Sequence, residues 1–322
     1  GSLPLPLPKI KFDEKQIISS TGALSLNSVP KKMLIIGAGY IGIEMGSVWS
    51  RLGSEVQVIE FLDYIVPGMD LEISKEFYKI LIKQGIKFNL KTKVDQIIKQ
   101  KNSVKVIAST KNGNSKEFNC DVVLISVGRK PNSNGLNLEK LKIKVDKQKR
   151  IEVDNKFKTS VPNIFAIGDV IKGSMLAHKA EEEGIAVAEI IAGQAGHVNY
   201  DIIPGVIYTT PEVASVGSTE EQLIKLNKKY KVGKFPFVAN PRAKTINETE
   251  GFVKILTDTI TDKVLGVHII GPHAGEMIAE AVLAMEFGAS SEDIARTCHA
   301  HPTYSEAIKE AALAIDKRTI HS

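Results

Sequence analysis

A glycine-rich turn between an apolar strand and a helix constrains the fold of this chain more than any other feature. Residues 32–36 predict a short buried strand, a helical pattern follows up to Gly53, and residues 55–60 predict a second strand. The segment therefore forms one βαβ unit of about thirty residues. Three glycines open its helix in the spacing G-x-G-x-x-G, namely Gly37, Gly39 and Gly42.

These glycines have the order of a dinucleotide-binding turn. Gly37 permits the tight turn, Gly39 lets the backbone approach a pyrophosphate at the positive end of the helix, and Gly42 lets the helix pack closely on the strand. Glu60 ends the second strand and could accept hydrogen bonds from a ribose diol. Its charge would repel a 2′-phosphate, and no arginine follows within residues 61–64. The sequence predicts NAD and not NADP, although the glycines could also form plain turns.

A second candidate site lies near the C-terminus, in the run His301-Pro302-Thr303-Tyr304-Ser305-Glu306. Proline favours the start of a helix, which would place the His301 imidazole at a rigid helix entrance. Glu306 could fix the imidazole tautomer and raise its basicity, as a general base near neutral pH requires. Thr303-x-x-Glu306 is also a capping box, in which Glu306 only satisfies the helix N-terminus. Both interpretations stay open at this point.

Two other acidic residues each allow two interpretations. Glu44 is expected in the first turn of the helix after the glycines, where a carboxylate favours the helix dipole in any case. Asp169 follows a predicted strand at residues 164–167, at the edge where open α/β sheets place ligands. It could equally cap the turn that follows.

The composition excludes several classes of function. The formal net charge of +5 comes from scattered lysines without clustered arginines or aromatic residues, so we expect no nucleic-acid partner. No apolar run is long enough to predict a membrane span. The two cysteines, Cys120 and Cys298, belong to no C-x-x-C motif, and Cys120 is expected to be packed. A zinc ion at Cys298, His299 and His301 would lack a fourth ligand, so we expect no metal site.

The chain divides into four expected parts. They are a tail and linker at 1–29, a nucleotide-binding Rossmann-like domain at 30–150, a middle segment at 151–203 and a β-rich C-terminal domain at 204–322. Further elements are expected as helices at 70–84, 176–192, 274–287 and 303–315, strands at 122–127, 164–167, 251–256 and 264–270, and a turn at 111–114.

Taken together, the motifs resemble the pyridine nucleotide–disulfide oxidoreductases over essentially the whole chain. The resemblance is closest to the branch that oxidises protein-bound dihydrolipoamide. It rests on the glycine turn with Glu60 and on residues 159–169, 175–180 and 298–303. The last two stretches make it specific, since a generic NAD-binding protein has no reason to carry them. The implied fold is α/β, with a Rossmann-like FAD/NAD(P)-binding domain and an α+β dimerisation domain.

The resemblance also implies roles for individual residues. NAD would be bound by Gly37, Ala38, Gly39, Tyr40, Ile41, Gly42, Glu44, Glu60, Val94 and Gly128. FAD would be lined by Gly168, Asp169, Met175, Leu176, Ala177 and His178. His301, held by Glu306, would be the base that takes and returns a thiol proton at the flavin and disulfide of a partner subunit. Electrons would pass through that disulfide and FAD to NAD. The implied partners are a second copy of the chain and the lipoyl domains of 2-oxo acid dehydrogenase or glycine cleavage complexes.

The sequence departs from the family pattern at its start. Family members begin with an FAD-binding βαβ unit and a closely spaced redox-active cysteine pair, and neither occurs in these 322 residues. We therefore expect an N-terminally truncated, inactive form in which FAD binding is in doubt. Apolar side chains of the middle segment are then expected to be exposed or repacked, including Ile164, Phe165, Ile185, Val187, Ile190 and Ile191.

The same residues allow two other interpretations. One is another disulfide reductase of the family, such as a glutathione reductase, which Glu60 disfavours because that enzyme resembles an NADP user. Another is a plain NAD-binding and dimerising module without redox activity. The sequence leaves open whether the protein works in a bacterial cytoplasm or in a mitochondrial matrix.

Overall fold

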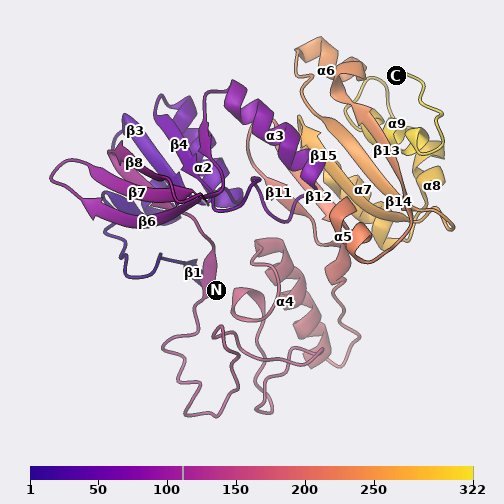
Figure 1. Cartoon of the computed structure of the whole chain (residues 1–322). Coiled ribbons are helices and arrows are strands. Elements are labelled where there is room, and N and C mark those ends of the chain that lie inside the picture. Colours follow the sequence, from indigo (N-terminus) through magenta and orange to yellow (C-terminus); the bar gives the residue numbers. More distant parts are fainter. Residues whose placement is uncertain (111, 322) are drawn as a thin grey trace. The chain divides into compact units, whose positions relative to one another are not determined.

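The computed structural model describes residues 1–110 and 112–321 (Figure 1). The chain separates into two compact units. Unit 1 comprises residues 1–8 and 127–200, and unit 2 comprises residues 9–126 and 201–322. Residues 127–150, which we assigned with the nucleotide-binding domain, thus cluster with residues 151–200. Within the described residues, no helix is long and apolar enough to cross a membrane.

The nucleotide-binding part of unit 2 is built on a parallel five-stranded sheet. Its order is β2 (Ile17–Ile18), β9 (Val122–Ile125), β3 (Lys32–Ile36), β4 (Glu55–Ile59) and β5 (Lys87–Asn89). The predicted βαβ unit is confirmed, with α2 (Tyr40–Arg51) joining β3 to β4. The predicted helix at 70–84 is α3 (Leu71–Lys83), capped by Asp70. Gly53 and Gly85, after the two helices, have φ of 104° and 96°, which glycine adopts without strain.

The N-terminal segment, residues 1–29, contributes short elements to each of the two units. In unit 1, β1 (Ser2–Pro4) pairs antiparallel with β10 (Arg129–Pro131), and Pro4 fits there because two-stranded edges tolerate proline. In unit 2, β2 joins the parallel sheet and α1 (Ser20–Ala23) follows it. The apolar pair at β2 is buried, which is why this short stretch is ordered as a strand.

A three-stranded antiparallel sheet completes this part of unit 2. Its strands are β6 (Thr92–Lys99), β7 (Val104–Thr110) and β8 (Ser115–Cys120). The turn predicted at 111–114 connects β7 to β8, and its residue Lys111 lies outside the described residues. Cys120 is buried as expected, and burial raises the pKa of its thiol to about 12.

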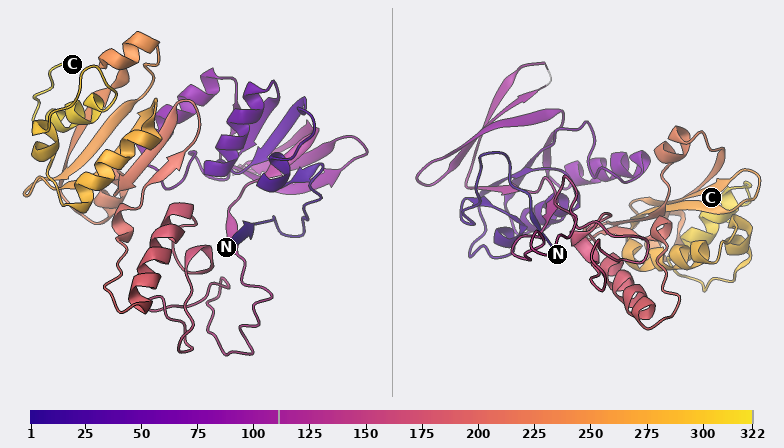
Figure 2. Two further views of the ribbon diagram at one scale, coloured as in Figure 1. Left: turned by 180° about the vertical axis from the view of Figure 1, so that it is seen from behind. Right: turned by 90° about the horizontal axis from the view of Figure 1, so that it is seen from below.

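The C-terminal part of unit 2 is an antiparallel sheet with helices packed on it (Figure 2). The order is β11 (Gly205–Ile207), β12 (Glu212–Gly217), β15 (Val264–Gly271), β14 (Phe252–Asp258) and β13 (Tyr230–Pro236). The helices are α5 (Glu220–Lys225), α6 (Pro241–Ile246), α7 (Ala274–Glu286), α8 (Ser291–Arg296) and α9 (Glu306–Ala314). The predicted strands and both predicted helices are confirmed, except that α9 begins three residues later than expected.

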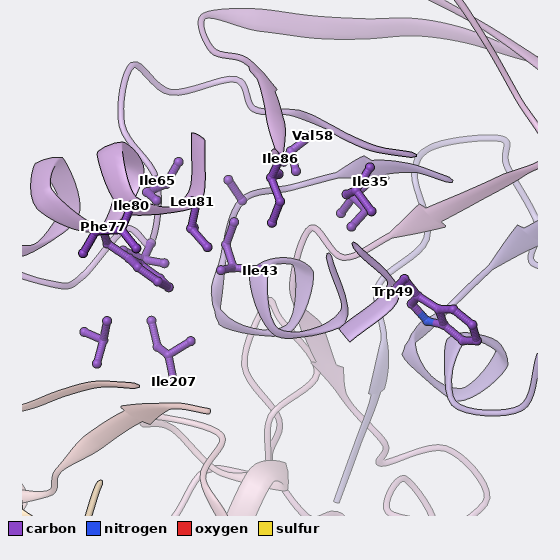
Figure 3. Packing of buried hydrophobic residues seen from close by; sticks show 14 of the residues in the cluster. Ile35, Ile43, Trp49, Val58, Ile65, Phe77, Ile80, Leu81, Ile86 and Ile207 are labelled. Atoms are coloured by element: carbon purple, nitrogen blue, oxygen red, sulfur yellow. The ribbon is translucent and has the colours of Figure 1, made fainter. Parts of the chain in front are cut away.

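One apolar core joins the parallel sheet and the C-terminal antiparallel sheet of unit 2. The buried face of α3 carries Phe77, Ile80 and Leu81 at helical spacing, and it packs with Ile43 of α2 and Ile207 of β11 (Figure 3). Each fully buried side chain of this kind contributes about 1.5–3 kcal/mol to stability. The core therefore fixes the glycine turn and the C-terminal domain within one packed unit.

Residues 127–200 of unit 1 form few helices and strands. The predicted helix at 176–192 is confirmed as α4 (Ala177–Ile191), and a 3₁₀ turn, η1 (Gly168–Val170), precedes it. The predicted strand at 164–167 is wrong. Phe165 makes only an isolated bridge with Lys158, so this apolar run lacks the continuous ladder that a strand requires. Ile185 and Ile191 are 56% and 64% exposed, as expected, whereas the other four apolar side chains named above are half-buried.

Candidate functional site

The glycine turn in unit 2 has the backbone that its spacing predicts. Gly37 adopts a φ of 104°, which favours glycine. A Cβ atom on Gly42 would lie 2.1 Å from the Gly37 carbonyl oxygen and 2.6 Å from Ser126 Oγ, so helix and strand approach too closely for any side chain. A Cβ atom on Gly39 would meet nothing within 4 Å. The absence of a side chain at Gly42 thus lets α2 pack closely on β3. At Gly39 the space where a Cβ atom would lie is not filled by protein atoms.

The open space lies at the N-terminus of α2. Gly39 is the N-cap residue and supplies no side-chain hydrogen bond to the helix. The first backbone N–H groups of a helix have no intrahelical acceptor, and they carry the positive end of the dipole. This arrangement fits a pyrophosphate, whose oxygens would accept those hydrogen bonds without a clash at Gly39.

Glu60 is tied to the glycine turn itself, a contact that the sequence did not predict. Its carboxylate is buried, Oε2 accepts a 2.7 Å hydrogen bond from the Ala38 N–H, and Oε1 accepts one of 2.8 Å from the Leu62 N–H. The Ala38 carbonyl in turn accepts from the Val66 N–H at 2.8 Å. Each carboxylate oxygen can accept a second hydrogen bond, so Glu60 can hold the turn and still receive a ribose hydroxyl.

Other predicted NAD residues lie on α2 and on β6. Glu44 lies in the second turn of α2 and not the first, and it accepts a 2.9 Å hydrogen bond from the Tyr208 N–H. Burial raises the pKa of Glu44 above its usual range, against the opposing effect of that hydrogen bond. Burial also raises the pKa of Tyr40 to about 12. Val94 is half-buried in β6, next to an irregularity of the β6–β7 ladder.

In unit 1, the N-terminal residues 2–5 contact both Gly128 and Asp169. Gly128 has a φ of 124°, and its carbonyl accepts from the Leu5 N–H at 3.0 Å. The Ser2 hydroxyl donates to Asp169 Oδ2 at 2.5 Å and accepts from Arg129 Nε at 2.7 Å. Sequence reasoning missed Ser2 and Arg129, since nothing in their spacing to Asp169 signals the contact.

A buried ion pair supports the turn that carries Asp169. Gly168 donates its N–H to Glu183 Oε2 at 2.7 Å, and Lys179 pairs with Glu183 at 2.9 Å. The side chains of Lys179 and Glu183 are 1% and 0% exposed. Tyr200 donates its hydroxyl to Glu183 at 2.8 Å, and burial together with this carboxylate raises the pKa of Tyr200. The only sequence signal for the pair was its i, i+4 spacing.

Met175, Leu176, Ala177 and His178 lie where α4 begins. Leu176 is the N-cap residue, Ala177 is the first residue of the helix, and no side chain caps it. Ala177 is exposed and the other three are half-buried. The backbone N–H groups of this first turn could therefore donate to a ligand, as the predicted flavin contact requires.

His301 and Glu306 form the pair that the sequence suggested. The distance from His301 Nδ1 to Glu306 Oε1 is 2.8 Å, and Glu306 Oε2 accepts from the Thr303 N–H at 2.7 Å. The Thr303 hydroxyl donates to the Ala300 carbonyl and not to the helix, so only half of a capping box exists. Glu306 thus holds the His301 imidazole with Oε1 and accepts from the Thr303 backbone with Oε2.

The charge state of this pair follows from its contacts. Burial raises the pKa of Glu306, but hydrogen bonds from Thr303 and His301 outweigh it and hold the pKa below its usual range. An ionised carboxylate only accepts hydrogen bonds, so the proton of the neutral imidazole resides on Nδ1. Nε2 has no partner among the described residues, and the His301 side chain is 59% exposed. The lone pair of Nε2 is therefore free to accept a proton.

Two more histidine–glutamate pairs flank this one and were missed. His299 Nε2 lies 2.7 Å from Glu280 Oε1, and its Nδ1 lies 3.0 Å from the Thr297 carbonyl. His321 Nδ1 lies 2.7 Å from Glu310 Oε1. Cys298 is exposed and unbonded. Across residues 1–110 and 112–321, no three His, Cys, Asp or Glu side chains are grouped in a way that could hold a metal ion.

Comparison with known proteins matches both parts of the chain. The family model described as pyridine nucleotide-disulphide oxidoreductase matches residues 2–184, and that of the family's dimerisation domain matches residues 203–312. Dihydrolipoyl dehydrogenase 1, mitochondrial, of Arabidopsis thaliana is 60% identical over 322 residues, covering 100% of this chain and 64% of that protein. Dihydrolipoyl dehydrogenase of Manduca sexta is 59% identical over 319 residues, covering 98% and 64%.

The fold agrees with solved structures. The HOCl-induced flavoprotein disulfide reductase RclA from Escherichia coli superposes with a TM-score of 0.88 at 27% identity, covering 98% of this chain and 72% of that one. The chain spans 64% of the length of the two dihydrolipoyl dehydrogenases. Because the two family models together match nearly the whole sequence, this chain belongs to the pyridine nucleotide–disulphide oxidoreductases.

Proposed function

We propose that these residues form the NAD-binding, flavin-contacting and subunit-pairing part of a dihydrolipoyl dehydrogenase, which oxidises protein-bound dihydrolipoamide to lipoamide. The observation that carries the proposal is the His301–Glu306 pair with its free Nε2. A module that only bound NAD would need no exposed imidazole held in one tautomer by a carboxylate. The two relatives described above, at 60% and 59% identity, bear the same activity in their names.

In this proposal His301 is the base of the thiol chemistry. A dihydrolipoamide thiol is a weak nucleophile, and removal of its proton gives the reactive thiolate. His301 Nε2 takes that proton, while Glu306 stabilises the imidazolium through Nδ1. The imidazolium can later return the proton to a leaving thiolate.

The residues present fit both cofactors of the family. The α2 N-terminus and the open space at Gly39 would hold the pyrophosphate of NAD, with Glu60 beside the ribose. Asp169, fixed through Ser2 and the Lys179–Glu183 pair, and the first turn of α4 would contact FAD. When bound, FAD and NAD supply the electron-accepting chemistry. The carboxylate of Glu60 favours NAD over NADP because it would repel a 2′-phosphate.

The proposed partners are a second copy of the chain and lipoyl domains. The match to a dimerisation domain at residues 203–312 supports pairing through the C-terminal sheet and helices. Lipoyl domains of 2-oxo acid dehydrogenase or glycine cleavage complexes would deliver the dihydrolipoamide. A mitochondrial location is proposed on the name of the Arabidopsis relative.

A second candidate function applies to these 322 residues by themselves. Cys120 is buried with a raised pKa and Cys298 is a lone exposed thiol, so neither can supply a closely spaced redox pair. Lipoamide oxidation then requires cysteines other than these two. We therefore expect the isolated chain to bind NAD and to form dimers without producing NADH from dihydrolipoamide.

A chimera tests the proposal directly. This chain would replace the matching 322 residues of the Arabidopsis relative, and lipoamide-dependent NADH formation would be measured. Visible flavin absorption would verify assembly. We expect an active chimera, and a loss of about 10²- to 10⁴-fold in kcat/KM for His301→Gln, the range typical of general bases. The control is His197→Gln, at an exposed histidine of unit 1. Full activity of the flavin-loaded His301→Gln chimera would refute the role of His301.

A further inference from the structure

The loop that follows Glu60, residues 61–70, has a strained backbone at its centre. Val66 is fully buried and adopts a φ of 46°, a left-handed conformation that a β-branched residue rarely takes. Its N–H group donates a 2.8 Å hydrogen bond to the Ala38 carbonyl, in the glycine turn. A strained residue keeps its conformation only where its surroundings hold it. The contacts on either side of Val66 therefore decide whether the loop supports the turn.

The far end of this loop is fastened to the C-terminal domain. Asp70 is fully buried and caps α3, since its Oδ1 accepts a 3.0 Å hydrogen bond from the Glu72 N–H. Lys254 of β14 donates to the same carboxylate, with Nζ 3.0 Å from Oδ1 and 3.2 Å from Oδ2. Oδ2 also accepts from the Glu220 N–H, at the start of α5, at 3.2 Å. A buried ion pair thus joins the C-terminal sheet to the residue where loop and helix meet.

Hydrogen bonds connect this ion pair to the proposed nucleotide site. Met69, next to Asp70, donates its N–H to the Val66 carbonyl at 3.1 Å. The Val66 N–H continues the connection to Ala38, whose own N–H donates to Glu60. The connection runs through backbone groups of one short loop, so a shift of Asp70 would reach the turn.

The ammonium group of Lys254 is unusual for its position. Residues 252–257 of β14 are all buried, and Lys254 is the charged one among them. Besides Asp70, the carboxylates of Glu72 and Glu220 lie 3.1 Å and 2.5 Å from its Nζ. Burial lowers the pKa of Lys254, but hydrogen bonds to these carboxylates outweigh it and hold that pKa above its usual range. Apolar side chains of similar volume often stabilise a fold as well as a buried ion pair does. Stability alone therefore gives no reason for a charge at this site.

We propose that Lys254 is a positioning residue for the nucleotide site, which holds Asp70 and with it the loop 61–70 in the shape that supports the Ala38 turn. The proposal rests on the proposed NAD site. A preformed turn loses less conformational freedom when a pyrophosphate and a ribose bind to it. Release of the loop should therefore weaken NADH binding, although Lys254 is not among the proposed NAD contacts.

The test uses the full 322-residue chain with Lys254→Met and Asp70→Asn combined. Methionine keeps most of the lysine volume, asparagine can still cap α3, and neither member of the pair remains as an unpaired buried charge. We expect the dissociation constant for NADH to rise about 3- to 10-fold, as for couplings carried by such networks. Hydrogen exchange of a peptide that covers residues 61–70 should become faster relative to a peptide of β3.

Two further variants complete the experiment. Lys83→Met breaks an exposed ion pair with Glu250, at the other end of α3, and should change neither the NADH affinity nor the exchange of the loop. Asp70→Asn alone keeps the helix cap and weakens the attraction to Lys254, so it should shift both measurements in the same direction by a smaller factor. This single variant carries the test if the double variant does not fold.

The outcomes separate this role from plain stabilisation. A pair that only stabilises the fold would, when removed, speed exchange equally in the loop and in β3 and leave the NADH affinity of the folded chain unchanged, which would overturn the proposal. Unchanged exchange of the loop in both Asp70 variants would overturn it too. A wild-type chain that binds no NADH would refute the proposed nucleotide site itself and, with it, the effect on binding, whatever the exchange of the loop shows.

Discussion

The buried carboxylate of Glu60 accepts a 2.7 Å hydrogen bond from the backbone N–H of Ala38, between the first two glycines of the turn. The residue that would recognise the ribose is therefore also the residue that holds the phosphate-binding turn in shape. Specificity for the nucleotide and rigidity of its site depend on one side chain.

Replacement of Glu60 should affect binding and stability together. Glu60→Gln keeps the size of the side chain but removes the charge-assisted acceptor from Ala38, which contributes about 1.5–3 kcal/mol. We expect weaker NADH binding and a smaller preference for NADH over NADPH, measured by calorimetric titration. Urea unfolding should show a parallel loss of stability. Equal affinities of the wild-type chain for NADH and NADPH would contradict the role of Glu60 in selecting the nucleotide.

Two alanine substitutions separate packing from ligand access. In Gly42→Ala the new Cβ would lie 2.1 Å from the Gly37 carbonyl oxygen, so helix and strand must move apart, at a cost of about 1–3 kcal/mol. In Gly39→Ala the Cβ meets no protein atom within 4 Å, and the fold should be unaffected.

NADH titration distinguishes the two variants further. Gly39→Ala should still lose affinity, because its methyl group would occupy the space through which a pyrophosphate approaches the backbone. A Gly39→Ala chain with wild-type stability and wild-type NADH affinity would place the pyrophosphate elsewhere.

The nucleotide-binding fold could be predicted from the sequence because local signals agree with one another there. The strand at 32–36, the glycines, the helix and Glu60 each indicate the same βαβ unit. The strand predicted at 164–167 failed because an apolar run says nothing about a neighbour to pair with. The strand β2 was not predicted, because two residues are too few to show the alternation of apolar and polar residues that indicates a strand.

The site was predicted only where the partners lie close in sequence. Glu306 is five residues from His301, and their contact could be suspected from the motif. Asp169 and Ser2 are 167 positions apart, and only the folded chain brings them together. His321 and Glu310 lie eleven positions apart, but no known pattern of helix ends connects them.

The buried ion pair of unit 1 gives a stability prediction. Lys179→Met leaves the Glu183 carboxylate buried without its cation, and Glu183→Gln leaves the ammonium group buried without its anion. Each should cost about 3–5 kcal/mol in the free energy of unfolding. The double variant should recover part of that loss, because it leaves no unpaired charge. As a control, Lys105→Met breaks a partly exposed pair with Glu117 and should cost no more than about 1 kcal/mol. Additive losses in the double variant would argue against the pair as a unit.

A pH dependence of stability follows from His299. Both ring nitrogens face acceptors, the Glu280 carboxylate and the Thr297 carbonyl, so the surroundings favour the doubly protonated ring. The hydrogen bond to Glu280 raises the pKa of His299 above its usual value, against the opposing effect of burial. A raised folded-state pKa means that the histidine stabilises the protein fully below its unfolded pKa of about 6.5. That contribution is lost as pH rises through the folded pKa.

Urea unfolding from pH 5.5 to pH 9, compared between the wild-type chain and His299→Gln, checks this dependence. The wild-type chain should lose stability relative to the variant toward alkaline pH. His197→Gln, at an exposed histidine of unit 1, serves as the control. The loss should appear in the unfolding of unit 2, since His299 anchors the loop before His301 to α7 through Glu280. A constant difference between the wild-type chain and His299→Gln across this range would mean that His299 has the same pKa folded and unfolded, and that its contacts stabilise the loop without regard to charge.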